Sequence, residues 1–329
     1  MVLLIGTRDG LFRTTNPTAG QLEHVREETT GVTGTQSDVF AYSSDCLYRS
    51  SDSGKSWTAV DIPDSDRITA VETNPVTDDV YLATYPPARL YVSADSGETW
   101  QQLGSFPDLP SVTVWKAKQQ EFNSLREAGG MIKDVTVHPD APDRLIAGVE
   151  LAGAFVSSDD GSTWEHRSQG LHSDVHTIIP LTRRDEYIAA CGSGLYRTEN
   201  AGQSWARVDT SYTYFFHTYF HAALLYDDVV YTAAATGPPP TWRGKHGAET
   251  VLFESHNDAD TLNRVAYPGE PNEYIMAFTA FNGQVIAGTV AQSLDEGGTT
   301  RARLLQREDT GNWRTLTHIP AGVTSLCAL

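Results

Sequence analysis

Residues 157–164 read SSDDGSTW, and this octet decides the fold because near copies of it recur along the chain. The copies are SSDSGKSW at 50–57, SADSGETW at 93–100 and TENAGQSW at 198–205, with a shortened REDTGNW at 307–313. Each follows an apolar or aromatic segment that alternates like a β-strand. In such a turn a carboxylate accepts bonds from backbone amides, Gly permits a positive φ, and Trp anchors the following strand between sheets. The octets therefore predict a series of β-hairpins.

The shared pattern, Ser/Thr-x-Asp-x-Gly-x-Ser/Thr-Trp, resembles the Asp-box (BNR) repeat of sialidase-like and sortilin-like β-propellers. At the level of blades the resemblance covers essentially the whole chain, and it is nearest to BNR-repeat proteins described as glycosyl hydrolase-like. It implies that the Asp-box residues are structural and lie away from the face that carries function. The residues concerned are Asp52, Asp95, Asp159, Asn200 and Asp309.

Placing these turns between the third and fourth strands of a blade leaves seven pairs of second and third strands. The pairs are VLLIGT/GLFRT, VFAYS/CLYRS, VYLAT/RLYVS, RLIAGV/GAFVS, YIAAC/GLYRT, VVYTAA/TVLFES and QVIAGT/ARLLQ. We expect residues 1–329 to form a single all-β domain, a seven-bladed propeller of four-stranded antiparallel sheets. The C-terminal segment GVTSLCAL, 322–329, should complete the blade begun by the first three strands and so remove exposed sheet edges. A six-bladed ring is the alternative.

Composition narrows the class of protein. Of 329 residues, 40% are hydrophobic, enough for a sizeable core. The net charge of −18 opposes binding to nucleic acid phosphates, and 19 Arg against 5 Lys favours adaptation to high salt over an ordinary acidic surface. No apolar run is long enough to span a bilayer and no secretory signal is visible, so we expect a cytoplasmic protein. Cys46, Cys191 and Cys327 form no disulfide pattern.

Three long excursions, 104–132, 236–249 and 291–300, are predicted on the face opposite the Asp boxes, where we expect any site. The first carries Trp115 on a helix-like stretch. The second is rich in Pro and Gly and forms either a self-packed loop or a pocket wall able to stack a ring and hold an anion. Its candidate ligand-binding residues are Trp242, Arg243, Lys245 and His246.

Acidic residues are expected to converge near the central channel on that same face. Asp134 and Asp174 begin inner strands at equivalent positions in adjacent blades, Glu150 follows a second strand, and His176 lies nearby. Close carboxylates can supply an acid with a raised pKa, a base or a divalent-metal site; alternatively they cap strands. No other cofactor is suggested. The aromatic run that follows adds Tyr212, Tyr214 and His217 as candidate ligand contacts.

Function stays open between two classes. Walker, dinucleotide, His-Glu-x-x-His and nucleophile-elbow motifs are absent, and so is the Arg-Ile-Pro motif of sialidases. The favoured hypothesis is a non-catalytic scaffold that recognises a protein, small molecule or carbohydrate on the face opposite the Asp boxes. The alternative is a glycosidase-like or lyase-like enzyme that uses Glu150, Asp174 and Asp134.

Overall fold

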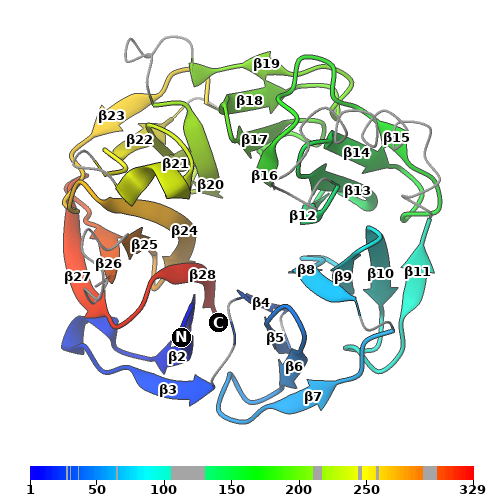
Figure 1. Ribbon diagram of the computed structural model, residues 1–329, viewed down its shortest axis with the longest axis horizontal. Coiled ribbons are helices and arrows are strands. Elements are labelled where there is room, and N and C mark those ends of the chain that lie inside the picture. The colour runs from blue at the N-terminus through cyan, green and yellow to red at the C-terminus, as the bar shows by residue number, and fades with distance from the viewer. Residues whose placement is uncertain are drawn as a thin grey trace.

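Seven four-stranded antiparallel sheets surround a central axis in the computed structural model of the protein (Figure 1). The structure describes residues 1–26, 29, 31–35, 37–63, 66–104, 130–209, 217–243, 247–256, 259–291 and 302–329. The seven-bladed ring predicted from the octets is therefore confirmed, and the six-bladed alternative is wrong.

Each blade uses its strands in chain order from the axis outward, apart from the first blade. The first blade holds β28 (Val323–Ala328), β1 (Leu3–Thr7), β2 (Gly10–Thr14) and β3 (Glu23–Arg26); the second holds β4 (Gly31–Gly34), β5 (Val39–Tyr42), β6 (Leu47–Ser50) and β7 (Thr58–Val60). The third holds β8 (Arg67–Thr73), β9 (Val80–Tyr85), β10 (Arg89–Ser93) and β11 (Gln101–Leu103); the fourth holds β12 (Ile132–His138), β13 (Ala141–Val149), β14 (Gly153–Ser157) and β15 (Glu165–His166). The fifth holds β16 (Val175–Pro180), β17 (Tyr187–Cys191), β18 (Gly194–Thr198) and β19 (Ala206–Arg207); the sixth holds β20 (Tyr219–Tyr226), β21 (Val229–Ala235), β22 (Val251–Ser255) and β23 (Asn263–Val265). The seventh holds β24 (Glu273–Phe281), β25 (Gln284–Ala291), β26 (Ala302–Arg307) and β27 (Trp313–Ile319).

The Asp-box turns join the third and fourth strands of their blades. In the fourth blade, Asp159 Oδ1 accepts from the backbone N of Thr163 at 2.8 Å and Asp159 Oδ2 from the Thr163 hydroxyl at 2.7 Å. Ser157 Oγ donates to Asp159 at 2.7 Å and accepts from Gly161 N at 2.8 Å, while Gly161 has a φ of 81°. One carboxylate thus closes the whole turn. The boxes of Asp52, Asp95 and Asn200 repeat this arrangement.

The shortened copy at 307–313 closes its turn differently. Asp309 Oδ1 accepts from the side chain of Gln284 at 3.3 Å, and the turn itself is closed by Glu308 N donating to Asn312 O at 2.8 Å. The missing residue before its Trp leaves Asp309 without the register of the full octet.

The core lies between neighbouring blades, where the octet Trp residues pack. Trp164 is 8% exposed, donates from Nε1 to Gly161 O at 3.1 Å, and packs with Phe155 and Leu103 in a cluster that joins the third and fourth blades. Burying an aromatic of this size between sheets is a main stabilising contribution of the repeat.

The ring is closed by the two ends of the chain. β28 pairs antiparallel with β1, with Leu3 opposite Ala328 and Ile5 opposite Leu326. Val2 and Leu329 exchange both backbone bonds, at 2.8 and 2.9 Å. This pairing covers the edge that β1 would otherwise expose.

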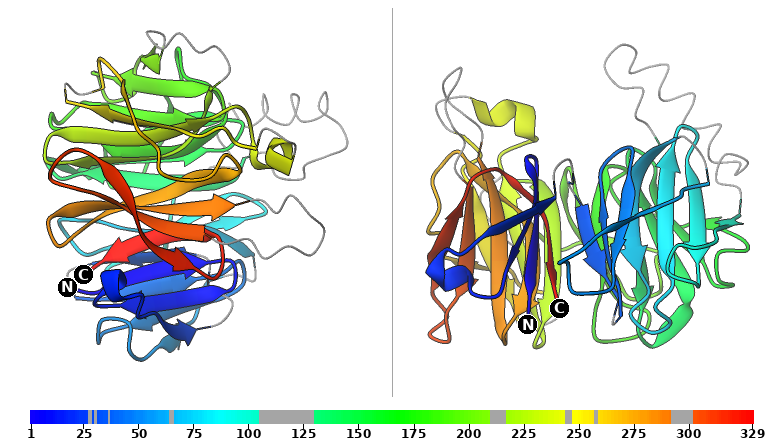
Figure 2. Two further views of the ribbon diagram at one scale, coloured as in Figure 1. Left: turned by 90° about the vertical axis from the view of Figure 1, so that its left-hand side faces the viewer. Right: turned by 90° about the horizontal axis from the view of Figure 1, so that it is seen from below.

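The two faces of the ring differ. Figure 2 shows the short helix η4 (Pro239–Arg243), within the β21–β22 connection, projecting from one face while both termini lie toward the other. We call the first the loop face; it also carries the connections between successive blades. The second is the Asp-box face. Most of 104–132, nearly all of 291–300, and residues 244–246 lie outside the described residues.

Candidate functional site

Two acidic residues predicted to converge lie on the loop face, one after the second strand of the fourth blade and one before the innermost strand of the fifth. Glu150, at the end of β13, is 7% exposed, and its Oε2 lies 3.1 Å from Nζ of Lys133 on β12. Asp174 immediately precedes β16, and its Oδ1 lies 3.5 Å from Nε2 of His176. Each carboxylate thus has a basic neighbour on an inner strand.

His176 is oriented by a neighbouring strand. Its Nδ1 lies 2.6 Å from the carbonyl oxygen of Phe220 on β20, and a carbonyl can only accept, so Nδ1 donates. Its Nε2 is therefore the ring nitrogen that faces Asp174.

A second histidine completes this cluster and was missed from the sequence. His221 on β20 stacks on His176 with ring centroids 5.1 Å apart and planes at 21°. Burial, the charge of His176 and the charge of Lys133 lower the pKa of His221 to about 3, so this ring is neutral. Tyr219 packs on His176 at 4.9 Å. The alternation of the aromatic run 211–226 was the available signal, because it sends successive side chains to the two faces of the blade, toward its two neighbours.

Asp134, the third expected acid, lies inside the seam between two blades. It is 8% exposed, and its Oδ2 accepts from the backbone N of Ile178 on β16. Burial raises the pKa of Asp134 to about 7, which its hydrogen bonds to the backbone N of Ile178 and Val135 oppose. A β-bulge at the start of β12 lets Lys133 and Asp134 leave the strand in directions that simple alternation does not give.

Glu72 on β8 is a further acid that the sequence did not single out. Water reaches part of it, yet burial followed by the charge of Asp134 raises its pKa well above the usual value. Tyr42, whose ring packs against Gly31, has a pKa raised by burial and by Glu72. These buried acids therefore oppose each other's ionisation.

Metal binding at the loop face was left open by the sequence. Within the described part of the chain, no group of three or more His, Cys, Asp or Glu side chains could hold a metal ion.

Trp242, in the excursion 236–249, does not have the ligand-binding position that we expected from the sequence. The ring is fully buried, donates from Nε1 to Gly237 O at 2.7 Å, and packs on Tyr274 at 4.9 Å and Tyr219 at 6.1 Å. Trp242 therefore anchors the excursion to the core and is not a pocket wall. The backbone of Arg243 ends η4. The other expected contacts, Trp115, Tyr212, Tyr214, Lys245 and His246, lie outside the described residues.

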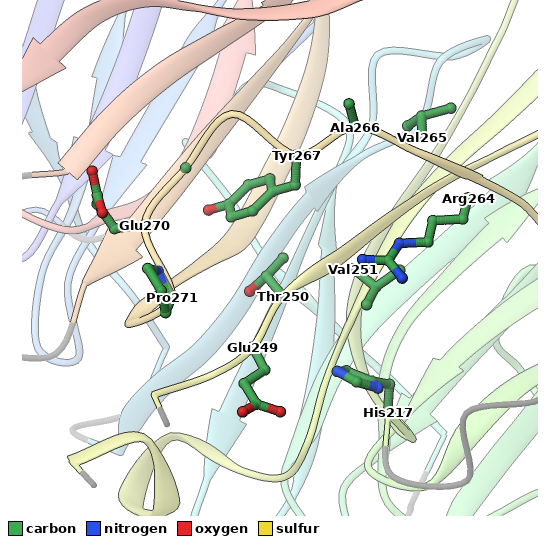
Figure 3. Close-up of a pocket in the computed structure, with 11 residues that line it drawn as sticks. His217, Glu249, Thr250, Val251, Arg264, Val265, Ala266, Tyr267, Glu270 and Pro271 are labelled. Atoms are coloured by element: carbon green, nitrogen blue, oxygen red, sulfur yellow. The ribbon is translucent and has the colours of Figure 1, made fainter. Parts of the chain in front are cut away.

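A cavity of about 800 Å³ lies on the loop face over the sixth blade (Figure 3). It is bounded by His217 before β20, by residues 249–251 at the start of β22, and by residues 264–271, which run from β23 into the connection to the seventh blade. Of the expected ligand contacts that the structure describes, His217 is among its lining residues. Burial lowers the pKa of His217, opposed by a hydrogen bond to the backbone of Glu249.

Other polar residues of this cavity were missed: Glu249, Thr250, Arg264, Tyr267 and Glu270. For Tyr267 and Glu270 the available signal was the irregular AYPGEP, 266–271, whose Pro and Gly mark a connection between blades. Gly269 is required there because a Cβ would lie 2.3 Å from the Tyr267 ring.

A smaller cavity of about 460 Å³ lies on the Asp-box face between the second and third blades. Its guanidinium, Arg49, is held by Asp38 through two bonds of 2.8 and 2.9 Å, and Ser96 donates to Asp38 at 2.7 Å. Burial would raise the pKa of Asp38, but the bonds from Arg49 and Ser96 outweigh it and the pKa is lowered. The arrangement joins two blades.

Among the described residues, no helix is long and apolar enough to cross a membrane.

Comparisons with known proteins agree on the architecture. No family model matches the chain. No curated protein matches it in sequence. Among solved structures, a GH74 xyloglucanase from Xanthomonas campestris is similar over 96% of this chain and 46% of its own, at 18% identity and a TM-score of 0.62. A protein from Lactobacillus plantarum is similar over 99% and 98%, at 14% identity and a TM-score of 0.62.

A structure of YCF48 bound to D1 peptide is similar over 98% of this chain and 86% of its own, at 12% identity and a TM-score of 0.61. This chain spans less than half the length of the GH74 chains, 40% and 46% in two cases. At these identities the likeness establishes the fold alone. The chain is a seven-bladed β-propeller, and the solved structures similar to it include GH74 enzymes and a YCF48 structure bound to a peptide.

Proposed function

We propose that the chain is a non-catalytic propeller that recognises a partner protein through its loop face. The observation that carries this proposal is that the candidate catalytic acids are held by other groups. Glu150 pairs with Lys133, Asp174 lies 3.5 Å from His176, and Asp134 accepts from a backbone amide inside a blade seam. A glycosidase needs one carboxyl group that gives its proton to the leaving group and another free to attack or to activate water. Acids held in this way are poorly suited to either role.

Recognition without chemistry suits a rigid ring. A YCF48 structure bound to D1 peptide is similar to this chain in fold, and this chain covers most of its length. The loop face here offers a cavity of about 800 Å³ bounded by three separate chain segments.

The alternative is a glycoside hydrolase-like or lyase-like enzyme. It is favoured by the contact between Asp174 and His176 and by the fold likeness to GH74 enzymes. Because this chain spans less than half the length of those enzymes, the common fold does not by itself support glycosidase activity here.

Three narrower proposals accompany the first. We propose membership of the Asp-box superfamily because the turns of Asp52, Asp95, Asp159 and Asn200 share one set of bonds. We propose a setting of high salt because the net charge is −18 and lysines are few. We also propose a cytoplasmic location, as expected from the sequence.

The deciding experiment measures turnover and binding on the same preparation. Reducing-end release from xyloglucan and a panel of other polysaccharides is assayed with the wild type, Glu150→Gln and Asp174→Asn, and the wild type is also applied to an array of synthetic octapeptides. We expect no release above the blank and retention of some peptides. Polysaccharide cleavage that disappears in either variant would overturn the recognition proposal in favour of the enzyme.

A further inference from the structure

We propose that the cavity over the sixth blade is a docking groove for an extended basic peptide of the partner protein. This inference rests on the recognition function and adds where the partner binds and what chemistry it presents. No residue of the groove belongs to the cluster around His176, so the two sites can be tested separately.

The groove has the size and construction of a binding site. Its volume of about 800 Å³ is within the range of about 300–1,000 Å³ typical of ligand pockets. Figure 3 shows Tyr267, Glu270 and Pro271 toward one side and Arg264 and His217 toward the other, with Thr250 between them. Thr250 is held in place because its hydroxyl donates to the carbonyl oxygen of Glu273. The two sides of the groove are therefore formed by segments that adjoin strands of the ring.

The fixed charges of the groove favour a cation. Among the described residues, its lining carries two carboxylates, Glu249 and Glu270, against one guanidinium, Arg264. His217 adds no charge at neutral pH because burial lowers its pKa. Arg303 lies 3.0 Å from Glu270 but also 3.0 Å from buried Glu273, so its charge is divided between two acids.

Glu270 remains available to a ligand. Its side chain is 62% exposed despite the contact with Arg303, whereas that of Glu273 is 3% exposed. The net charge of −18 over the whole chain adds a long-range attraction for basic segments.

Tyr267 supplies a surface for the long side chain of a Lys or Arg. Burial, then the charge of Glu273, raises the pKa of its hydroxyl well above the usual value, which places that hydroxyl in the protein interior. The ring is fixed by its close approach to Gly269. A cation that lies on an aromatic face and ends at a carboxylate gains from both contacts. Glu249, at the start of β22, would receive a second basic residue of the same peptide.

The test uses the full-length protein and three fluorescein-labelled octapeptides that alternate Ala with Lys, Gln or Glu. Fluorescence anisotropy at low salt should rank the Lys peptide first. Glu249→Gln and Glu270→Gln should each weaken its binding about two- to fivefold, as expected for exposed ion pairs. The matched control is Glu98→Gln, an exposed acid on the Asp-box face that removes the same charge and should leave Kd unchanged.

Charge reversal sharpens the result. The double variant Glu249→Lys with Glu270→Lys should prefer the Glu peptide over the Lys peptide, whereas Glu98→Lys with Glu165→Lys, on the other face, should not.

If the control variants change binding as much as the groove variants, attraction to the whole acidic surface explains the data and the groove is refuted. If array peptides bind with affinities that the groove variants do not alter, the inference fails while the recognition function stands. If the Glu peptide binds the wild type best, or none of the three binds, the basic-peptide assignment is wrong; the recognition function is then decided by the turnover assay.

Discussion

Two buried carboxylates in the fourth blade show how a neighbour decides what an acid can do. Glu150 lies beside the ammonium group of Lys133, with Oε2 3.1 Å from Nζ. Asp134, on the same strand as Lys133, receives only dipoles, from the backbone N of Ile178 and Val135, and its pKa is raised to about 7. The difference arises from direction, since the bulge in β12 turns Asp134 into the seam with β16.

Asp134→Asn should stabilise the protein at neutral and alkaline pH. A pKa that is higher in the folded than in the unfolded state means that wild-type stability falls as pH rises from about 4 to about 7 and is then constant. Asn avoids this loss because its side-chain oxygen can still accept from Ile178 N. The advantage of the variant should therefore grow over that interval and reach at most about 4 kcal/mol, from three pKa units at 1.36 kcal/mol each.

Urea unfolding at a series of pH values from 4 to 9 measures this difference. Asp140→Asn, the same change at an exposed turn after β12, is the control and should show no such pH dependence. A variant that is less stable than the wild type at pH 8 would mean that Asp134 is stabilising when ionised, contrary to this account.

At the scale of the element, the Asp-box hairpin works because one side chain satisfies several turn donors at once. In the boxes of Asp52, Asp95 and Asp159, the last Ser or Thr donates its hydroxyl to the carboxylate at 2.6, 2.5 and 2.7 Å. In the box of Asn200 the bond is reversed, with the amide Nδ2 donating to Ser204 Oγ at 2.9 Å. A neutral amide replaces a charge-assisted bond there.

Asn200→Asp should therefore raise the thermal unfolding midpoint above about pH 4. The new carboxylate can accept from Ser204 N and from its hydroxyl, the same bonds that lower the pKa of Asp159. Because a lowered folded-state pKa stabilises only the ionised form, the gain should vanish as pH falls through that pKa. Calorimetry at pH 3 and pH 7 tests both parts.

The control for added charge is Asn312→Asp, in the exposed turn of the shortened copy. An equal shift in the two variants would mean that the box geometry contributes nothing, and a lowered midpoint in Asn200→Asp alone would contradict the role assigned to the carboxylate.

These elements also show why the fold could be predicted and much of the site could not. The octets and the strand pairs between them depend on residues within about ten positions, so all seven blades were predicted from local patterns. The burial of Trp242 depends on Tyr274, thirty-two residues further along the chain, and its aromatic and basic neighbours suggested a pocket instead. The groove over the sixth blade is formed by connections without regular structure, whose side-chain directions follow no period. The direction of the Asp134 side chain depends on a β-bulge in β12, which simple strand alternation does not predict.

For the whole molecule, two features act against each other. The pairing of β28 with β1 joins the ends of the chain into a ring without an exposed edge at that point, so every blade packs between two others. The same compact ring holds 42 acidic against 24 basic side chains, and their mutual repulsion is larger in the folded state than in an expanded chain.

Salt should therefore stabilise the ring, and most of the effect should come early. The screening length falls from about 10 Å at 0.1 M to about 3 Å at 1 M, so the unfolding midpoint should rise over this interval and change little above it if repulsion is the only cause. Thermal unfolding in KCl from 0.1 to 3 M measures the curve. A variant in which five exposed acids of the Asp-box face are replaced by Gln should have a higher unfolding midpoint at 0.1 M KCl, and its midpoint should rise less with salt.

A wild-type midpoint that does not rise by 1 M KCl would show that the acidic surface does not destabilise the fold, and it would remove the physical reason for proposing a setting of high salt. A rise that continues steadily to 3 M would instead require salt effects beyond screening, such as stronger burial of the apolar seams between blades.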